Sequence, residues 1–182
     1  SVSFVPLGPK TGNAEVLSYL LDDNDRLWIG TNGKGLYVME PGGQTKFFYR
    51  SGDTGSDEIR DILTDSKYVW LGTTNGVVVL DKKSARRIKS FGTNESLPYN
   101  FIYKLLLYNG EVYIGTETDR LYKIDRELNL QPAGCIMSGS TKNKILSFTK
   151  DSRGAIWTAT GGNGAFSCFS DSVYSVTRSN GL

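Results

Sequence analysis

Apolar and polar positions follow a pattern that repeats four times along the chain. The most regular part is a five-residue run, apolar–aromatic–aliphatic–small–Thr, which is first seen as Leu-Trp-Ile-Gly-Thr; in the fourth run Thr158 replaces the aliphatic residue. The four runs occupy residues 27–31, 69–73, 112–116 and 156–160, and their aromatic residues follow one another at 42, 43 and 44 residues. Such a fixed period predicts similar supersecondary units stacked side by side.

Each repeat contains four short apolar runs separated by turn-forming Asp, Asn and Gly residues. In the first repeat these runs span residues 16–21, 27–31, 36–39 and 46–49, which predicts an antiparallel meander of four strands. The first strands of the repeats superpose at two apolar positions, which repeat at 42, 43 and 43 residues. These positions are Leu17, Ile59, Ile102 and Ile145, and then Leu20, Ile62, Leu105 and Phe148.

The predicted fold is therefore all-β, with four four-stranded antiparallel repeats of about 42–44 residues that are typical of β-propeller blades. We expect blade 1 at residues 13–54, blade 2 at 55–97, blade 3 at 98–140 and blade 4 at 141–178. Residues 1–12 are expected to form the outer strand of a preceding blade and a linker, and residues 179–182 to start the next linker. The whole is interpreted as one segment of a larger propeller.

The recurring residues have physical roles in such blades. The aromatic residue fills the wide space between neighbouring blades, where a flat ring buries more area than an aliphatic chain. The glycine that follows allows the next backbone to approach closely. The structural core positions are Trp28, Gly30, Trp70, Gly72, Tyr113, Gly115 and Trp157. In the third repeat Arg120 stands where the other repeats carry Gly before the third strand, so we expect that turn to be built differently.

Composition narrows the classes of function. The 21 Lys and Arg residues nearly balance the 19 Asp and Glu residues, which gives no reason to expect nucleic acid or an anionic membrane as partner. No apolar run is long enough for a membrane-spanning helix. The chain has no His, which removes His-based catalysis and His metal sites, and we expect no catalytic residues, no metal and no cofactor. The pair Asp57-Glu58 is interpreted as solvated loop charges. A disulfide between Cys135 and Cys168 stays open.

One stretch closely resembles the two-component regulator propeller repeat: Asp-Asn-Asp-Arg-Leu-Trp-Ile-Gly-Thr, from Asp23 to Thr31, followed by Gly-Leu at 35–36. Residues 150–157 carry the same Asp-x-x-Gly-x-aliphatic-Trp signature, and Asn180-Gly181-Leu182 matches the usual linker. The resemblance implies a seven-bladed propeller in the periplasmic, extracytoplasmic sensor region of Bacteroides-type hybrid two-component proteins. It also implies a polysaccharide-derived ligand whose binding is signalled to a histidine kinase. The alternatives are a non-catalytic scaffold for protein–protein interaction and, more distantly, a propeller lyase or hydrolase.

Candidate ligand contacts lie where the innermost strands begin, at the end of the blades that carries the linkers. Aromatic rings there could stack on a sugar, and amide, carboxylate and guanidinium groups could bind its hydroxyls. The candidates are Glu58, Arg60, Tyr99, Asn100, Tyr103 and Asn143. For Tyr99 and Tyr103 the alternative is simple packing.

The outward faces of the first and fourth blades are expected to lack neighbours within this chain. Depending on strand register, they should expose residues such as Tyr19, Val38, Phe166 or Tyr174. An exposed apolar face favours self-association or coverage by further blades of the parent chain.

Overall fold

The computed structural model describes residues 14–52, 56–95, 97–118, 120–136, 143–169 and 172–181. These residues form antiparallel β-sheets and one short 3-10 turn, η1 (Thr93–Glu95). No helix in the described part of the chain is long and apolar enough to cross a membrane. The all-β prediction with propeller-type blades is confirmed. The chain divides into two compact units, Ser1–Ser90 and Phe91–Leu182.

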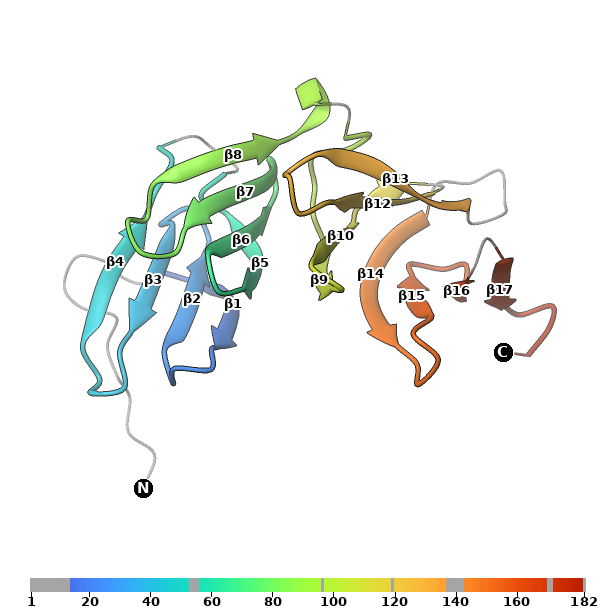
Figure 1. Ribbon diagram of the computed structural model, residues 1–182, viewed down its shortest axis with the longest axis horizontal. Helices are drawn as coiled ribbons and strands as arrows, with labels where there is room; N and C mark the ends of the chain where they lie inside the picture. The colour runs from blue at the N-terminus through green and yellow to red at the C-terminus, as the bar shows by residue number, and fades with distance from the viewer. Residues whose placement is uncertain are drawn as a thin grey trace. The chain divides into compact units, whose positions relative to one another are not determined.

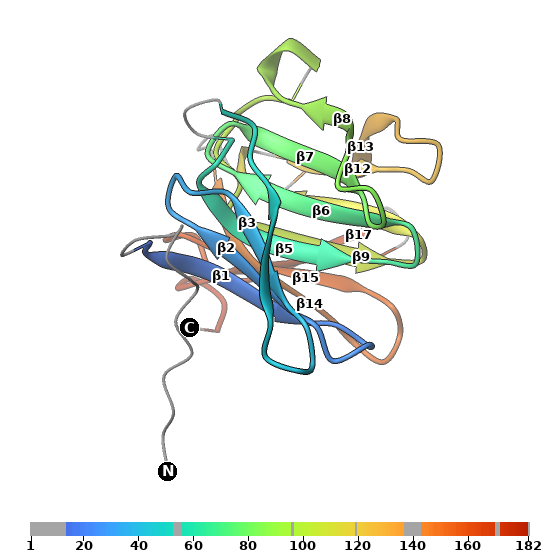
Figure 2. The same ribbon diagram turned by 90° about the vertical axis from the view of Figure 1, so that its left-hand side faces the viewer.

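The first unit contains two four-stranded sheets, which we call blades 1 and 2 (Figure 1). Blade 1 has the order β1-β2-β3-β4, and blade 2 has the order β5-β6-β7-β8. The first strands of the two blades, β1 and β5, contact each other. Figure 2 shows this unit facing the viewer. The bounds are β1 (Val16–Leu21), β2 (Leu27–Thr31), β3 (Leu36–Met39), β4 (Thr45–Tyr49), β5 (Ile59–Thr64), β6 (Tyr68–Thr73), β7 (Gly76–Asp81) and β8 (Arg87–Phe91).

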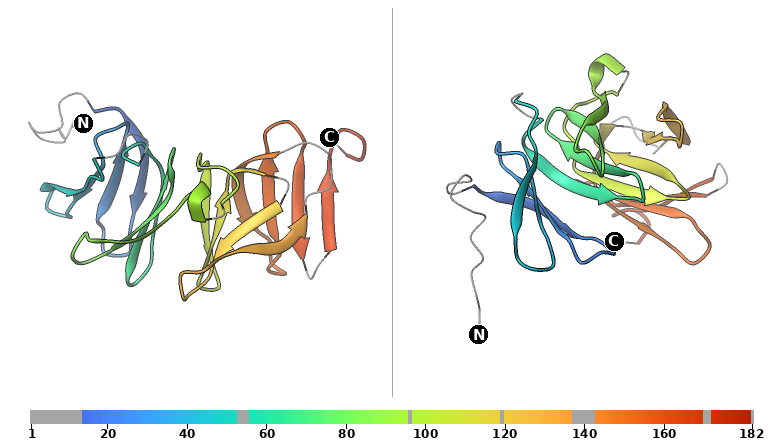
Figure 3. Two further views of the ribbon diagram at one scale, coloured as in Figure 1. Left: turned by 90° about the horizontal axis from the view of Figure 1, so that it is seen from above. Right: turned by 60° about the vertical axis from the view of Figure 1, so that its left-hand side comes forward.

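The second unit contains blades 3 and 4. Blade 3 has the order β13-β12-β10-β9, and blade 4 is a five-stranded sheet of order β11-β14-β15-β16-β17; β14 to β17 lie side by side in Figure 3 (left). The bounds are β9 (Lys104–Tyr108), β10 (Glu111–Gly115), β11 (Glu117–Thr118), β12 (Arg120–Ile124), β13 (Leu130–Ile136), β14 (Asn143–Lys150), β15 (Ile156–Thr160), β16 (Ala165–Phe169) and β17 (Ser172–Val176).

The turn that contains Arg120 is built differently, as expected from its missing glycine. Instead of closing a tight hairpin, residues 117–118 form β11, which pairs with Lys144 and Asn143 of the next blade. The Thr118 hydroxyl accepts the Arg120 backbone N–H at 3.2 Å. A strand from the third repeat thus joins the sheet of the fourth, which gives blade 4 its fifth strand.

The expected superposition of the first strands is wrong by one residue in blade 1. Val16 pairs with Thr31 and Tyr19 with Ile29, whereas Ile59 pairs with Thr73 and Ile62 with Leu71. The structural counterparts of Ile59 and Ile62 are therefore Val16 and Tyr19, not Leu17 and Leu20. The hairpin between the first two strands is one residue longer in blade 1 than in blade 2.

Neighbouring blades within each unit pack face to face. In the first unit, Trp28, Leu36 and Val38 of blade 1 form one buried cluster with residues of blade 2 that include Ile59 and Ile62. In the second unit, Tyr113 of blade 3 packs against a cluster that includes Ile145, Ile156 and Phe166 of blade 4. In both units the face that carries the repeat's aromatic residue meets the first strand of the following blade.

This packing decides which candidate surface residues are exposed. Val38 and Phe166 are buried between blades. Tyr19 remains 77% exposed on blade 1, and Tyr174 remains 56% exposed on blade 4. The outward faces predicted to lack neighbours therefore carry the two tyrosines and not the other two residues.

Candidate ligand-binding face and blade-end groove

Asp57 is the centre of the linker between blades 1 and 2. Its carboxylate accepts the backbone N–H groups of Ser51 at 2.6 Å and Gly52 at 3.1 Å, and its backbone carbonyl accepts the N–H of Gly33 at 3.0 Å. The residue is only 4% exposed, so the interpretation of Asp57 as a solvated loop charge is wrong. Asp57 is a structural acceptor that ties the linker to the turn between β2 and β3.

Asn100 occupies the corresponding position in the second unit, 43 residues after Asp57. Its side-chain oxygen accepts the backbone N–H of Thr93 at 2.7 Å, just as the Asp57 carboxylate accepts a linker N–H. The neighbouring Gly92 N–H donates to the Glu95 carboxylate at 2.7 Å. Whatever Asn100 contributes to a ligand, its amide oxygen already holds the linker.

Glu58 and Arg60 are the two candidates in the first unit. The Thr74 hydroxyl donates to the Glu58 carboxylate at 3.3 Å, so Glu58 connects the start of β5 to the turn between β6 and β7. Arg60 is exposed and lies at the β-bulge between Ile59 and Asp61. A bulge turns one side chain out of the regular alternation, which keeps the Arg60 guanidinium at the surface.

Tyr99, Asn100 and Tyr103 lie together in one segment of the second unit, and all three are partly exposed. The Tyr103 ring packs on Phe101 with ring centroids 4.7 Å apart, and its backbone N–H donates to the Gly115 carbonyl at 2.7 Å. The Thr116 hydroxyl contacts the carbonyls of Tyr99 at 3.2 Å and Phe101 at 2.8 Å. The backbone of this segment is thus held firmly, while two phenol rings remain partly accessible. Asn143 begins β14, but its side chain lies outside the described residues.

A second group of carboxylates, missed as a set in the sequence, lies at the opposite hairpin of the blades. In three blades an Asp accepts the indole N–H of the repeat's Trp with one oxygen and backbone N–H groups of its own turn with the other. The Asp-to-Trp distances are 2.9 Å for Asp22–Trp28, 2.9 Å for Asp65–Trp70 and 3.4 Å for Asp151–Trp157. The signal was the recurrence of Asp five or six residues before each Trp.

Asp22 shows the electrostatic consequence most strongly. Burial alone raises the pKa of a carboxyl, but hydrogen bonds from Trp28 and Arg26 and from the Asn24 backbone more than offset it and hold the pKa of Asp22 well below its usual range. Arg26 lies 2.8 Å and Lys82 3.6 Å from the same carboxylate. Asp22 is therefore a permanently charged structural acceptor and not a proton donor near neutral pH.

Blade 3 replaces the Asp–Trp pair with Glu111 and Tyr113. The Tyr113 hydroxyl donates to Glu111 at 3.3 Å, and Lys123 bonds the same carboxylate at 2.8 Å. Burial and the negative charge of Glu111 raise the pKa of Tyr113 to about 12. Within the described residues, no group of three or more His, Cys, Asp and Glu side chains is placed to hold a metal ion. The side chains of Cys135 and Cys168 fall outside the described part, so their pairing is not tested.

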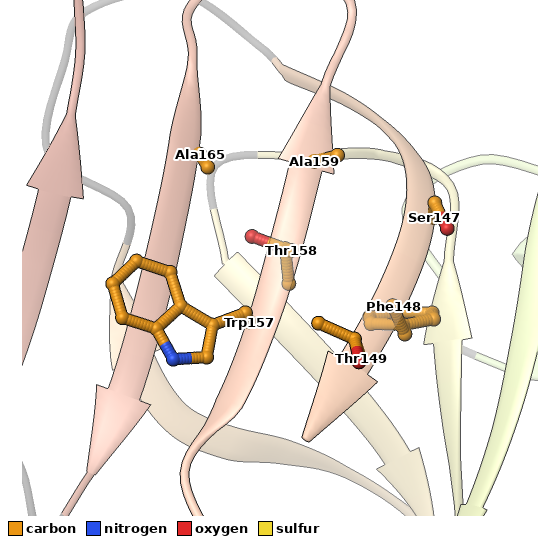
Figure 4. Close-up of a pocket in the computed structure, with 7 residues that line it drawn as sticks. All are labelled: Ser147, Phe148, Thr149, Trp157, Thr158, Ala159 and Ala165. Atoms are coloured by element: carbon orange, nitrogen blue, oxygen red, sulfur yellow. The ribbon is translucent and has the colours of Figure 1, made fainter. Parts of the chain in front are cut away.

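An apolar hollow lies on blade 4, away from the candidate residues of the linkers. It has a volume of about 260 Å³ and follows β14, β15 and β16 (Figure 4). We call it the blade-4 groove, and the residues that define it are Ser147, Thr149, Trp157, Ala159 and Ala165. Phe148 and Thr158 complete its lining. Trp157 is partly exposed here, whereas the equivalent Trp28 is fully buried.

Comparison with known proteins gives one family model and many similar folds. The model described as two-component regulator propeller matches residues 11–33. No curated protein matches the chain significantly. The extracellular domain of a putative hybrid two-component system from B. thetaiotaomicron is similar in structure, with a TM-score of 0.71 and 24% identity over 92% of this chain and 24% of that chain. This chain thus spans about a quarter of the length of that extracellular domain.

Other similar structures have different roles. A catalytically inactive virginiamycin B lyase from Staphylococcus aureus with quinupristin has a TM-score of 0.74 and 15% identity, covering 91% of this chain and 56% of the lyase. A computationally designed protein has a TM-score of 0.64 and 13% identity, covering 90% of this chain and 92% of the designed one. At these identities the likeness establishes the propeller-type fold alone.

Proposed function

We propose that the chain is part of the periplasmic sensor region of a hybrid two-component regulator and recognises a product of polysaccharide breakdown. The observation that carries the proposal is the match of the two-component regulator propeller model to residues 11–33. That stretch contains the same Asp22–Trp28 unit that the structure repeats in blades 2 and 4. The similar fold of a B. thetaiotaomicron extracellular domain agrees with this role.

A non-catalytic role fits the chemistry of the described carboxylates better than a lyase role. In the similar lyase structure, the catalytically inactive variant has a histidine replaced by alanine, and these 182 residues contain no histidine. Asp22 and Asp57 are each engaged by several N–H donors. General acid–base catalysis by a carboxyl needs a raised pKa, whereas the shifted Asp carboxyls here have lowered values.

The ligand contacts are proposed at the linker segment of the second unit. Tyr99 and Tyr103 present partly exposed rings on a backbone that is fixed by the Thr116 and Gly115 hydrogen bonds. Rigid aromatic rings favour sugar binding because little conformational entropy is lost when a pyranose stacks on them. In the first unit, the Glu58 carboxylate and the Arg60 guanidinium group provide hydrogen-bonding partners for the hydroxyl groups of a sugar.

Thermal unfolding with a panel of defined oligosaccharides tests the proposal, since a ligand that binds only the folded state raises the melting temperature. For a sugar that binds, Tyr99→Ala and Tyr103→Ala should each weaken affinity about tenfold, equal to about 1.4 kcal/mol. Tyr19→Ala is the matched control, because it removes a tyrosine that lies on the outward face of blade 1. Equal affinity in all three variants would move the site away from the linker segment, and no stabilisation by any sugar would count against oligosaccharide sensing.

A further inference from the structure

Positive charge is concentrated in one stretch of the chain. Residues 65–89 contain six Lys and Arg side chains but only two acidic ones, which gives a net charge of +4, whereas the net charge of the whole chain is +2. The near balance of the overall composition does not reveal this concentration. Five of the six cations are exposed, and we call these five the basic hairpin patch: Lys67, Lys83, Arg86, Arg87 and Lys89.

The patch lies at one edge of blade 2. Strand β8, which carries Arg87 and Lys89, is the outermost strand of this sheet (Figure 2). The turn between β7 and β8 carries the next two cations. The Lys82 backbone N–H in this turn donates to the Lys67 carbonyl at 2.9 Å, so the turn between β5 and β6 lies beside it. The five side chains therefore belong to one continuous surface.

The sixth cation and the two acidic residues of the stretch have structural roles. The Lys82 ammonium group donates to the Asp65 carbonyl at 2.9 Å and lies 3.6 Å from the Asp22 carboxylate of blade 1. The Asp65 carboxylate accepts backbone N–H groups of its own turn. The Asp81 carboxylate accepts the Ser84 N–H at 2.7 Å and the Ser84 hydroxyl at 2.8 Å. Two carboxylates that hold turns together cannot neutralise five exposed cations.

Protection of a sheet edge does not explain this concentration of charge. Charged side chains on an edge strand discourage pairing with a strand of another molecule. The outermost strands of the other three blades need the same protection, but β4 carries one cation, Lys46, and β13 and β17 carry none. The cations in and beside β8 therefore call for another explanation.

The shape and composition of the patch fit an extended anionic surface with an apolar layer. Small-molecule sites are concave, whereas these side chains are exposed along a turn and an outer strand. Ile88, between Arg87 and Lys89, is an aliphatic residue that is 38% exposed. A soluble polyanion would not stabilise this side chain, but the boundary between lipid headgroups and acyl chains would. On the side of blade 1, the exposed Asp23 and Asp25 limit the patch.

We propose that the basic hairpin patch binds the surface of a membrane that contains anionic phospholipids. The Lys and Arg groups contact the headgroup phosphates, and Ile88 enters the interfacial layer without spanning the bilayer. Each cation near an anionic surface should strengthen binding about fivefold. Because Glu58 bonds the turn between β6 and β7, it lies at the other end of these strands from the patch turns, so sugar binding at the linkers leaves the patch accessible. The proposal does not depend on the sensor function.

Co-sedimentation with vesicles tests the proposal, using phosphatidylcholine mixed with phosphatidylglycerol and phosphatidylcholine alone. The chain should bind only the vesicles with phosphatidylglycerol, and added salt should release it because salt screens exposed charges. The triple variant Arg86→Gln/Arg87→Gln/Lys89→Gln should bind these vesicles about a hundredfold more weakly. The matched control removes three exposed cations outside the patch and should bind like the unmodified chain: Lys34→Gln/Lys46→Gln/Arg178→Gln.

Ile88→Ser separates a lipid surface from other polyanions, because it keeps every charge of the patch. It should weaken vesicle binding about fivefold through the lost apolar contact and leave any binding of dextran sulfate, a soluble polyanion, unchanged. Circular dichroism checks that every variant is folded, as expected for substitutions at exposed positions. Absence of binding to the phosphatidylglycerol vesicles would overturn the proposal, as would equal losses in the two triple variants. Binding of dextran sulfate without vesicle binding would also overturn it and assign the patch to an anionic polymer.

Discussion

Removal of the Asp22 carboxylate is the sharpest test of how the blades are held. Asp22→Ala leaves the Trp28 indole N–H as a buried donor without its acceptor, which costs about 1–3 kcal/mol. It also removes the acceptor for the turn N–H groups of Asn24 and Arg26, which adds about 1 kcal/mol because these partly exposed groups can bind water instead. We therefore expect a loss of about 2–4 kcal/mol in the free energy of unfolding.

Asp151→Ala is the matched comparison. The Asp151 side chain is 24% exposed, and its bond to Trp157 is longer, at 3.4 Å. Solvent can replace most of what this carboxylate provides, so the expected loss in the free energy of unfolding is clearly smaller than for Asp22→Ala. Urea denaturation followed by tryptophan fluorescence measures both changes. A loss below about 1 kcal/mol for Asp22→Ala, or equal losses for the two variants, would refute the argument that the buried indole N–H depends on its carboxylate.

The pH dependence supplies an independent check on the same residue. The pKa of Asp22 is lower in the folded state than the value of about 3.9 in an unfolded chain. A carboxyl with a lowered folded pKa contributes stability that is complete above its unfolded value and is lost as the pH falls below it. The unmodified chain should therefore lose stability more steeply below about pH 4 than Asp22→Asn, which has no charge to titrate at this position. Parallel curves would show that Asp22 is not the titrating group.

Two further substitutions test the contact between blades 1 and 2 at Gly30 and the linker hydrogen bond of Asn100. Gly30→Ala should destabilise the first unit by about 1–3 kcal/mol, because the new methyl group would overlap Ile59 and the Ser18 hydroxyl. Gly42→Ala is the control, because a Cβ there meets nothing within 4 Å. Equal melting temperatures for the two variants would exclude a tight contact between the blades at Gly30. Asn100→Ala should lower the free energy of unfolding by about 0.5–1.5 kcal/mol, because the hydrogen bond from the Thr93 N–H is lost. Asn100→Asp should keep most of the stability, because Asp57 fills the same role in the first unit. A loss of ligand affinity without any change in stability would instead make Asn100 purely a ligand contact.

Much of the fold could be predicted because the blade pattern is repeated. The spacing of Trp28, Trp70, Tyr113 and Trp157 gave the number of sheets, and the glycines at Gly30 and Gly115 lie where close approach was expected. The roles of polar residues were harder to predict. Asp57 follows a Gly- and Ser-rich linker that reads as solvated, yet it is buried because the linker folds back onto its carboxylate. Neither composition nor periodicity predicts that the linker backbone folds back onto the Asp57 side chain.

Which residues of the first strand of blade 1 are exposed depends on one extra residue in the hairpin between β1 and β2. Asp22 precedes Trp28 by six residues, whereas Asp65 precedes Trp70 by five. Since Asp accepts the indole N–H in both blades, the extra residue must lie in the turn, and it shifts the first strand of blade 1 by one position relative to its Trp. A shift of one residue exchanges the two faces of a strand. Leu20 therefore turns toward the core shared with blade 2, and Tyr19 lies on the outward face of blade 1, where it is 77% exposed. The Asp-to-Trp spacing, read together with the Trp period, would have predicted this surface from the sequence.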